Sequence, residues 1–346
     1  MNYPFRNLVF EGGGVKGIAY VGALEILEGK GILEQIERVG GTSAGAINAV
    51  LLALGYTREE MLEILLEMNF NNFLDDSWGV VRDIDRLRDE FGWYKGDFFR
   101  TWIGNLVREK TGNENATFND LRNAGFRDLF LVGTNLSTGF AEVFSADHTP
   151  RWRIVDAVRV SMSIPLFFAS VRDMRGDVRV DGGVLDNYPI RLFDRAKYLF
   201  NDRHTRGDIP YYDEANASKP ETSSDYTYNM ESLGFRLDSA REIAIFRDGA
   251  EPQHRRIDDL FDYAWALIQT IMNAQNDRHL KTGDWHRTVY IDTLDVGTCD
   301  FDLEDEKKQA LIEQGRIGTN HYFTWYEGDG TRALGEAPPM NRPVKT

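Results

Sequence analysis

The sequence predicts an α/β fold: a three-layer α/β/α sandwich with a mainly parallel central sheet and a helical C-terminal extension. Two neighbouring units near the start of the chain carry this prediction. In the first, an apolar strand at residues 8–10 runs into a glycine-rich loop and a helix at 18–28. In the second, a strand at 38–40 runs into a glycine-flanked turn and an apolar helix at 46–54. Such units in succession imply parallel strands joined by right-handed crossovers.

Composition and charge narrow the class of protein. The chain has 346 residues, enough for one large domain or one domain with an appended subdomain, and 42% apolar and 27% charged residues are ordinary for a globular protein. The formal charge of -15 argues against nucleic acid as a partner and against strong docking on anionic lipid. A neutral or zwitterionic lipid surface stays open. Cys299 is the single cysteine, which excludes an intrachain disulfide and a multi-thiolate metal site.

Targeting signals are absent from the sequence pattern. No stretch reaches the roughly 20 apolar residues of a membrane helix. Residues 1–7 lead directly into the first strand and do not resemble a secretory signal. We therefore expect a cytoplasmic location by default, while attachment to a membrane surface or export as an effector is compatible with the same sequence.

The remaining elements follow from capping, periodicity and composition. Thr57 and Glu60 form a capping box before a helix at 61–70, and the tryptophan-rich segment 71–115 predicts helices and loops over one side of the core. Residues 201–229 are polar and predict a flexible excursion. Strands are expected at 129–135, 142–145, 178–180 and 288–291, and helices at 154–160, 258–281 and 303–326.

The turn at residues 41–45 has the pattern Gly-x-Ser-x-Gly, with Gly41 and Gly45 on either side of Ser43. A serine at a sharp strand-to-helix turn holds its hydroxyl clear of the backbone, and flanking glycines avoid collisions there. The helix that follows directs free N–H groups toward the serine and favours developing negative charge. The pentapeptide alone also fits an ordinary helix start, so its interpretation depends on partners elsewhere in the chain.

The glycine-rich loop matches the dinucleotide-binding pattern Gly-x-Gly-x-x-Gly, with Gly12, Gly14 and Gly17. Two features of the nucleotide-binding motifs are missing. In a dinucleotide-binding fold the second strand ends in an acidic residue that binds the ribose, but here this strand runs into the serine turn. In a P-loop the last glycine is followed by lysine, but here Ile18 follows Gly17.

The same loop fits a second use, which is to offer backbone N–H groups to an oxyanion. Ester cleavage passes through a tetrahedral alkoxide, and the amides of Gly12, Gly13 and Gly14 can converge on such an oxygen. Lys16 adds a positive charge beside them, although a solvated lysine at a helix start fits equally well.

A nucleophilic serine requires a base, and the candidates are the six histidines and a carboxylate, of which Asp181 has a distinctive position. Asp181 ends a strand before Gly182 and Gly183, where its side chain projects beyond the sheet, and residues 187–189 (Asn-Tyr-Pro) fix a second turn behind it. In isolation, Asp-Gly-Gly fits a hairpin turn better than a catalytic site. The histidines lie among polar residues in no recognisable setting: His148, His204, His254, His279, His286 and His321. No cluster has the spacing of metal ligands, and we expect neither a metal nor a cofactor.

Together, residues 11–17, 41–45 and 181–183 resemble the three motifs of the patatin-like phospholipases in order and spacing. Residues 161–165 (Ser-x-Ser-x-Pro) resemble a further family element, and the likeness covers about residues 7 to 195. It implies a Ser–Asp dyad with Ser43 as nucleophile and Asp181 as proton acceptor. It also implies an oxyanion hole from Gly12–Gly14, with Lys16 where the family carries Arg or Lys. Glu11 departs from the residues often seen before the glycines.

The resulting prediction is a serine lipid acyl hydrolase of the phospholipase A type, which cleaves fatty-acyl esters of phospholipids or other glycerolipids through an acyl-enzyme. An ordinary aspartate is a poor base for a serine, but shielding from water makes it usable. The apolar residues 164–168 fit an acyl slot or ordinary core. We expect a catalytic domain at 7–195, a polar excursion at 196–232 and a mainly helical part at 233–346 packed on the core.

Two alternatives use the same residues. A dinucleotide-binding protein would use the loop from Gly12 to Gly17 regardless of Ser43. A Ser–His–Asp esterase would depend on one of the histidines that follow the serine. A degenerate, non-catalytic scaffold is disfavoured because all three chemical elements are present.

Overall fold

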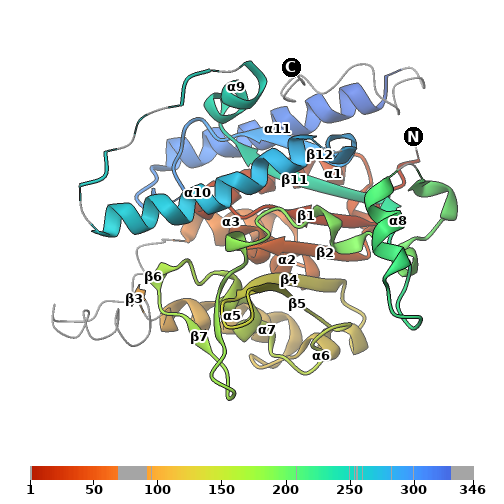
Figure 1. The fold of residues 1–346 in the computed structure, drawn as a ribbon, viewed down its shortest axis with the longest axis horizontal. Coiled ribbons are helices and arrows are strands. Elements are labelled where there is room, and N and C mark those ends of the chain that lie inside the picture. The colour runs from red at the N-terminus through yellow and green to blue at the C-terminus, as the bar shows by residue number, and fades with distance from the viewer. Residues whose placement is uncertain are drawn as a thin grey trace.

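One eight-stranded sheet forms the centre of the molecule in the computed structural model (Figure 1). The strand order is β12-β11-β1-β2-β4-β8-β7, and β5 pairs with β4 outside this path. The predicted α/β fold with a mainly parallel central sheet is confirmed. The structure describes residues 2–68, 92–94, 96–207, 209–248, 250–252, 254, 256–258, 260–281, 283–298 and 300–328. Cys299, the last two residues of the predicted helix at 61–70, residues 71–91 of the predicted tryptophan-rich segment and the C-terminal tail lie outside these ranges.

The sheet has a parallel part and an antiparallel part. The five strands paired in parallel are β1 (Asn7–Phe10), β2 (Arg38–Thr42), β4 (Asp128–Asn135), β11 (Ser232–Asp238) and β12 (Thr288–Asp292). β5 (Phe140–Ser145) and β8 (Val178–Asp181) pair with β4 in antiparallel fashion, and β7 (Val171–Arg172) pairs antiparallel with β8. Two small sheets lie apart from it, β3 (Gly92–Tyr94) with β6 (Leu166–Phe168) and β9 (Thr205–Arg206) with β10 (Tyr228–Asn229).

Alternate residues of the strands supply two separate hydrophobic clusters. Leu8 and Phe10 of β1 belong to the large cluster, which includes helix residues of α1 and α2. Val9, between them, belongs to a second cluster with Tyr188 and Ile190. Because side chains alternate along a strand, the two faces of the sheet are covered separately, as in a layered fold.

The α-helices of the described residues are the following: α1 (Ala19–Gly29), α2 (Ala44–Ala53), α3 (Arg58–Glu67), α5 (Asp97–Thr111), α6 (Phe118–Asn123), α7 (Ile154–Ser161), α8 (Pro210–Ala217), α9 (Ala240–Asp248), α10 (Leu260–Lys281) and α11 (Asp305–Tyr326). Every residue of α2 is buried, as its apolar sequence predicts. The capping box before α3 is present, since Thr57 and Glu60 exchange hydrogen bonds. None of the described helices has the length and apolar character needed to cross a membrane.

The C-terminal third of the chain enters the sheet. β11 pairs in parallel with β1, and β12 extends the sheet beyond β11. The polar segment 201–229 also has regular structure, with α8 and the β9–β10 pair. A buried ion pair anchors this region, because Arg287 donates to Asp194 and Asp194 accepts from Tyr212 of α8. The polar composition of residues 201–229 predicted a flexible excursion. The partners that order this segment lie far apart in the sequence, so composition alone does not reveal them.

Candidate active site

Strand pairing brings Ser43 and Asp181 to the same edge of β4. β5 pairs with β4 along residues 130–135, which leaves the opposite edge to β2 at 128–132 and to β8 at 133–135. β2 is parallel to β4 and β8 is antiparallel, so their C-terminal ends meet. Thr42 lies beside Val132 and Asp181 beside Gly133. The serine that follows Thr42 therefore faces the end of the aspartate strand.

The serine turn has a strained backbone. Ser43 has φ of 54° and ψ of -127°, a conformation that residues other than glycine rarely adopt. The neighbouring glycines are required by close packing, because a Cβ at Gly45 would overlap the Phe10 carbonyl and a Cβ at Gly41 would overlap the Gly45 carbonyl. Strain held in place by packing is typical of functional sites.

Residues 161–163 hold both halves of the site. The buried Ser161 hydroxyl accepts a hydrogen bond of 3.0 Å from the Ser43 amide. The Ser163 carbonyl accepts one of 2.8 Å from the Asp181 amide. Between them, the Met162 sulfur accepts the Ser43 hydroxyl at 3.7 Å. The Ser-x-Ser segment thus fixes the nucleophile and the aspartate to one short stretch of chain.

Asp181 is buried, with an exposed fraction of 1%. Its Oδ1 accepts a hydrogen bond of 2.7 Å from the Gly183 amide, while its buried Oδ2 has no hydrogen-bond partner among the described residues. Burial raises the pKa of Asp181 to about 7, against the smaller opposing effects of the Gly183 amide and the nearby Ser43 hydroxyl. A carboxylate with such a pKa is a far better proton acceptor at neutral pH than an ordinary aspartate.

The glycine loop lies against the serine. A Cβ at Gly12 would come within 3.0 Å of the Ser43 Cβ, and one at Gly17 within 3.0 Å of the Ala44 Cβ. The Gly12 amide donates to the Asn187 carbonyl at 3.0 Å, so it is not free to bind an oxyanion as the sequence suggested. The amides of Gly13 and Gly14 donate to no acceptor in the described part of the chain.

Two further backbone features belong to the site. Gly14 has φ of 58°, in the left-handed region that favours glycine. The amide of Ala44, the first residue of α2, also has no acceptor within the described ranges. It belongs to the free N–H groups at a helix start. The backbone amide of the residue after a nucleophilic serine is a common oxyanion donor. The Gly-x-Ser-x-Gly pattern therefore already indicated this amide.

Buried charges lie behind the glycine loop. Glu11 accepts a hydrogen bond of 2.7 Å from the Leu237 amide and lies 3.8 Å from Arg236, which forms an ion pair of 2.6 Å with Asp238. Burial raises the pKa of Glu11 to about 7, and Arg236 opposes this shift. Lys16 is partly buried, and its charge lowers the pKa of both Glu11 and Asp238. Lys16 therefore acts electrostatically on the acids behind the loop.

Asn187 and Gln275 connect the glycine loop to the aspartate loop. Asn187 Nδ2 donates to the Gly12 carbonyl at 3.1 Å, in addition to the bond its carbonyl accepts from the Gly12 amide. Gln275 of α10 accepts from the Asn187 amide at 2.9 Å and donates to the Gly183 and Val184 carbonyls at 2.9 Å. Gly182 packs so tightly that a Cβ would overlap the Val132 carbonyl. The sequence gives no local signal for Gln275.

The alternatives that use a histidine gain no support from the described contacts. Hydrogen bonds and ion pairs of Ser43 and Asp181 involve no histidine in the described residues. His204 instead pairs with Glu231, and His148 bonds with Ser145. The His279 side chain lies outside the described residues.

The predicted acyl slot divides between core and partly exposed residues. Ile164 and Phe168 are buried members of the large hydrophobic cluster. Leu166 and Phe167 are partly exposed, and the Phe167 ring lies 6.2 Å from Tyr94 and 5.7 Å from Phe301. Only Leu166, Phe167 and Pro165 of this run have surface available for an acyl chain.

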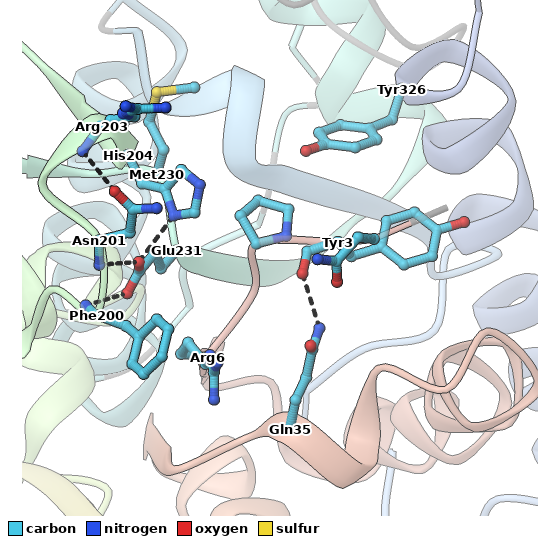
Figure 2. Close-up of a pocket in the computed structure, with 12 residues that line it drawn as sticks. Tyr3, Arg6, Gln35, Phe200, Asn201, Arg203, His204, Met230, Glu231 and Tyr326 are labelled. Atoms are coloured by element: carbon cyan, nitrogen blue, oxygen red, sulfur yellow. Dashed lines mark hydrogen bonds and ion pairs between the residues drawn. The ribbon is translucent and has the colours of Figure 1, made fainter.

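A separate polar cavity of about 400 Å³ lies at the other end of the sheet, near the start of β1 and β11 (Figure 2). Glu231 forms its buried wall and accepts hydrogen bonds from the Phe200 and Asn201 amides and from His204 Nδ1 (Figure 2). Ser43 and Asp181, at the C-terminal ends of their strands, do not line this cavity.

Comparisons with known proteins agree with the motifs. The model of the patatin-like phospholipase family matches residues 8–194. The uncharacterized protein YqhO of Bacillus subtilis is 32% identical over 329 residues, which span 91% of this chain and 97% of that protein. The probable lipid hydrolase 463L of invertebrate iridescent virus 6 is 27% identical over 188 residues, 54% of this chain and 63% of that protein. The solved structure of VipD from Legionella pneumophila shares the fold, with a TM-score of 0.55 and 17% identity over 93% of this chain and 67% of that one.

Proposed function

Because this chain belongs to the patatin-like phospholipase family, we propose that it is a serine lipid acyl hydrolase in which Ser43 and Asp181 act as a dyad. The observation that carries the proposal is the meeting of β2 and β8 on one edge of β4, which sets the strained serine beside a buried carboxylate. The substrate class is a fatty-acyl ester of a phospholipid or another glycerolipid, in line with the family and with the viral lipid hydrolase.

The first half-reaction forms an acyl-enzyme. The Ser43 hydroxyl turns from the Met162 sulfur toward Asp181 Oδ2, which is free to accept its proton. Ser43 Oγ attacks the ester carbonyl carbon as the proton passes to Asp181, and the carbonyl electron pair moves onto oxygen. The amides of Gly13, Gly14 and Ala44 are the free donors for that oxyanion. On collapse, the leaving alkoxide takes the proton from Asp181.

The second half-reaction releases the fatty acid. Asp181 accepts a proton from water as the water oxygen attacks the acyl carbon, and a second oxyanion forms on the same amides. Its collapse expels Ser43 Oγ, which recovers the proton from Asp181. A pKa near 7 suits a group that must accept and return a proton in each half-reaction.

The test compares hydrolysis of p-nitrophenyl butyrate and of phosphatidylcholine by the wild type and by single variants. We expect Ser43→Ala and Asp181→Asn to lose at least about 10³-fold in both activities, because each removes a group that bonds to the reacting atoms. Alanine at each of the six histidines should leave both activities within about threefold of the wild type.

Other outcomes would select another function. One histidine variant as inactive as Ser43→Ala would replace the dyad with a Ser–His–Asp triad. A fully active Ser43→Ala variant would exclude the serine mechanism. Binding of NAD to the Ser43→Ala protein, without esterase activity in the wild type, would support the dinucleotide interpretation of the glycine loop.

A further inference from the structure

Helix α10 carries a row of exposed apolar side chains. Tyr263, Leu267 and Ile271 are spaced by four residues and have exposed fractions of 58%, 50% and 42%. Residues four apart lie on one face of a helix, so these three side chains form a single stripe. Figure 1 shows α10 as a long helix at the outside of the molecule. We call these three residues the α10 stripe.

The next turn of the same helix touches the proposed catalytic loops. Gln275, one turn beyond the stripe, bonds with the Gly183 and Val184 carbonyls and with the Asn187 amide. Met272 is so close that a Cβ at Gly183 would lie 2.8 Å from its Cε. Leu185, in the loop that follows Asp181, is also exposed. The stripe therefore begins beside the aspartate loop and runs away from it along the surface.

Charge around the stripe limits what can cover it. Residues 257–275 include three aspartates and no lysine, arginine or histidine. Helices that bind anionic membranes carry lysine and arginine along their polar face, whereas the basic residues of α10 lie beyond Gln275 at its C-terminal end, at Arg278 and Lys281. The net charge of -15 also repels an anionic surface. A surface without net negative charge, with apolar material close beneath it, is complementary to this face.

We propose that the α10 stripe docks on the surface of a zwitterionic lipid aggregate, such as a phosphatidylcholine bilayer, and sets the Asp181 loop next to the lipid. The inference rests on the proposed lipid hydrolase function for its choice of partner. Apolar side chains at 263, 267 and 271 enter the interface, and the aspartates of the helix remain in water. A molecule docked in this way takes its substrate directly from the aggregate.

The experiment measures binding without hydrolysis. Proteins with Ser43→Ala are sedimented with sucrose-loaded phosphatidylcholine vesicles, alone and with Tyr263→Asp or Leu267→Asp. The control is Tyr211→Asp, because Tyr211 on α8 has the same exposed fraction as Tyr263, 58%. We expect each stripe variant to bind at least about tenfold more weakly, since it removes a buried apolar group and adds a charge. Tyr211→Asp should bind as the parent does.

Activity of proteins with Ser43 intact gives a second readout. Tyr263→Asp and Leu267→Asp should hydrolyse monomeric p-nitrophenyl butyrate at the wild-type rate and vesicle phosphatidylcholine at least about tenfold more slowly. Equal binding by stripe and control variants would overturn the docking proposal and leave the hydrolase intact. If the wild type hydrolysed no ester but still bound vesicles in a way that the stripe variants weaken, the proposed function would be overturned and the docking proposal would stand.

Two further outcomes would overturn the docking proposal. Tighter binding to phosphatidylglycerol than to phosphatidylcholine vesicles would contradict the charge argument. A dimer seen by light scattering that Leu267→Asp dissociates, with vesicle binding unchanged, would assign the stripe to a second copy of the chain.

Discussion

At the scale of single residues, Asp181 combines burial with incomplete hydrogen bonding. Its Oδ1 is held by the Gly183 amide, but its Oδ2 has no partner in the described part of the chain. A buried charge with an unsatisfied oxygen destabilises the folded state. The same environment raises its pKa to about 7, which suits proton transfer. In the proposed mechanism, stability and catalysis therefore make opposite demands on this residue.

The first prediction concerns the stability of Asp181→Asn. The pKa of Asp181 is about 7 in the folded protein and near the ordinary 3.8 in the unfolded chain, so the folded state binds more protons between these values. The free energy of unfolding therefore falls as pH rises from about 4 to 7. Asparagine does not ionise, so Asp181→Asn does not lose stability in this way as the pH rises. We expect the variant to be more stable than the wild type by roughly 2–4 kcal/mol at pH 8.

Urea denaturation at pH 4.5 and pH 8 checks this prediction. The two proteins should have nearly equal free energies of unfolding at pH 4.5, where the wild-type carboxyl is protonated in the folded state. Glu11→Gln serves as a comparison, because Glu11 has a similar raised pKa but bonds with the Leu237 amide and pairs with Arg236. If Asp181→Asn were less stable than the wild type at pH 8, burial of the charged Asp181 carboxylate would not destabilise the folded protein.

The residue scale also shows what motifs can predict. The sequence identified Ser43 and Asp181 as candidates because each occurs in a short pattern with a chemical meaning. It assigned the Gly12 amide to the oxyanion, whereas that amide bonds with Asn187. Hydrogen bonds between loops 175 positions apart leave no local pattern, so only the structure separates Gly12 from Gly13 and Gly14.

At the scale of elements, α10 connects parts of the site that no motif connects. Gln275 lies in the middle of an apparently ordinary helix and outside the 8–194 family match. It is nevertheless buried and bonds with three backbone groups of residues 183–187. The sequence predicted the helix at 258–281 from its periodicity, but a helix pattern does not show which loop its inner face will meet.

The second prediction treats Gln275 as a positioning residue. Gln275→Leu leaves the Asn187 amide and two carbonyls unpaired, so the glycine loop and the aspartate loop lose their common anchor. We expect kcat for p-nitrophenyl butyrate to fall about 10–100-fold and KM to change less than threefold, because alignment of reacting groups is lost.

A matched control comes from the same helix. Thr270 is exposed, and its hydroxyl bonds only with the Ala266 carbonyl in the described residues, so Thr270→Ala should keep the wild-type kcat. Steady-state kinetics and thermal unfolding are measured together. A Gln275→Leu protein with reduced stability and unchanged kcat would assign Gln275 a purely structural role.

At the scale of the whole molecule, the C-terminal third completes the sheet. β11 lies between β1 and β12, and α11 packs along α1. The sequence predicted strand and helix patterns in this part of the chain but no place for them in the sheet, because strand order depends on contacts between distant residues. Since β1 carries the glycine loop and pairs with β11, we expect the site and the C-terminal part to unfold as one unit.

The third prediction tests this unity at the α1–α11 contact. A Cβ at Gly22 of α1 would overlap the Ile312 carbonyl, and one at Gly315 of α11 would overlap the Ala19 carbonyl. Gly22→Ala must push the helices apart, and we expect it to lower the free energy of unfolding by about 1–3 kcal/mol despite the better helix propensity of alanine. The molecule should still unfold in one transition that removes esterase activity and helical circular dichroism together.

Gly29→Ala is the matched control for the same helix. Nothing lies within 4 Å of the position its Cβ would take, so only the helix propensity changes and the variant should be at least as stable as the wild type. Urea unfolding followed by ellipticity and by hydrolysis of p-nitrophenyl butyrate measures both properties. Activity that outlasts an early loss of ellipticity in Gly22→Ala would contradict a single transition, because the proposed catalytic loops would then keep their structure after α11 has separated from α1.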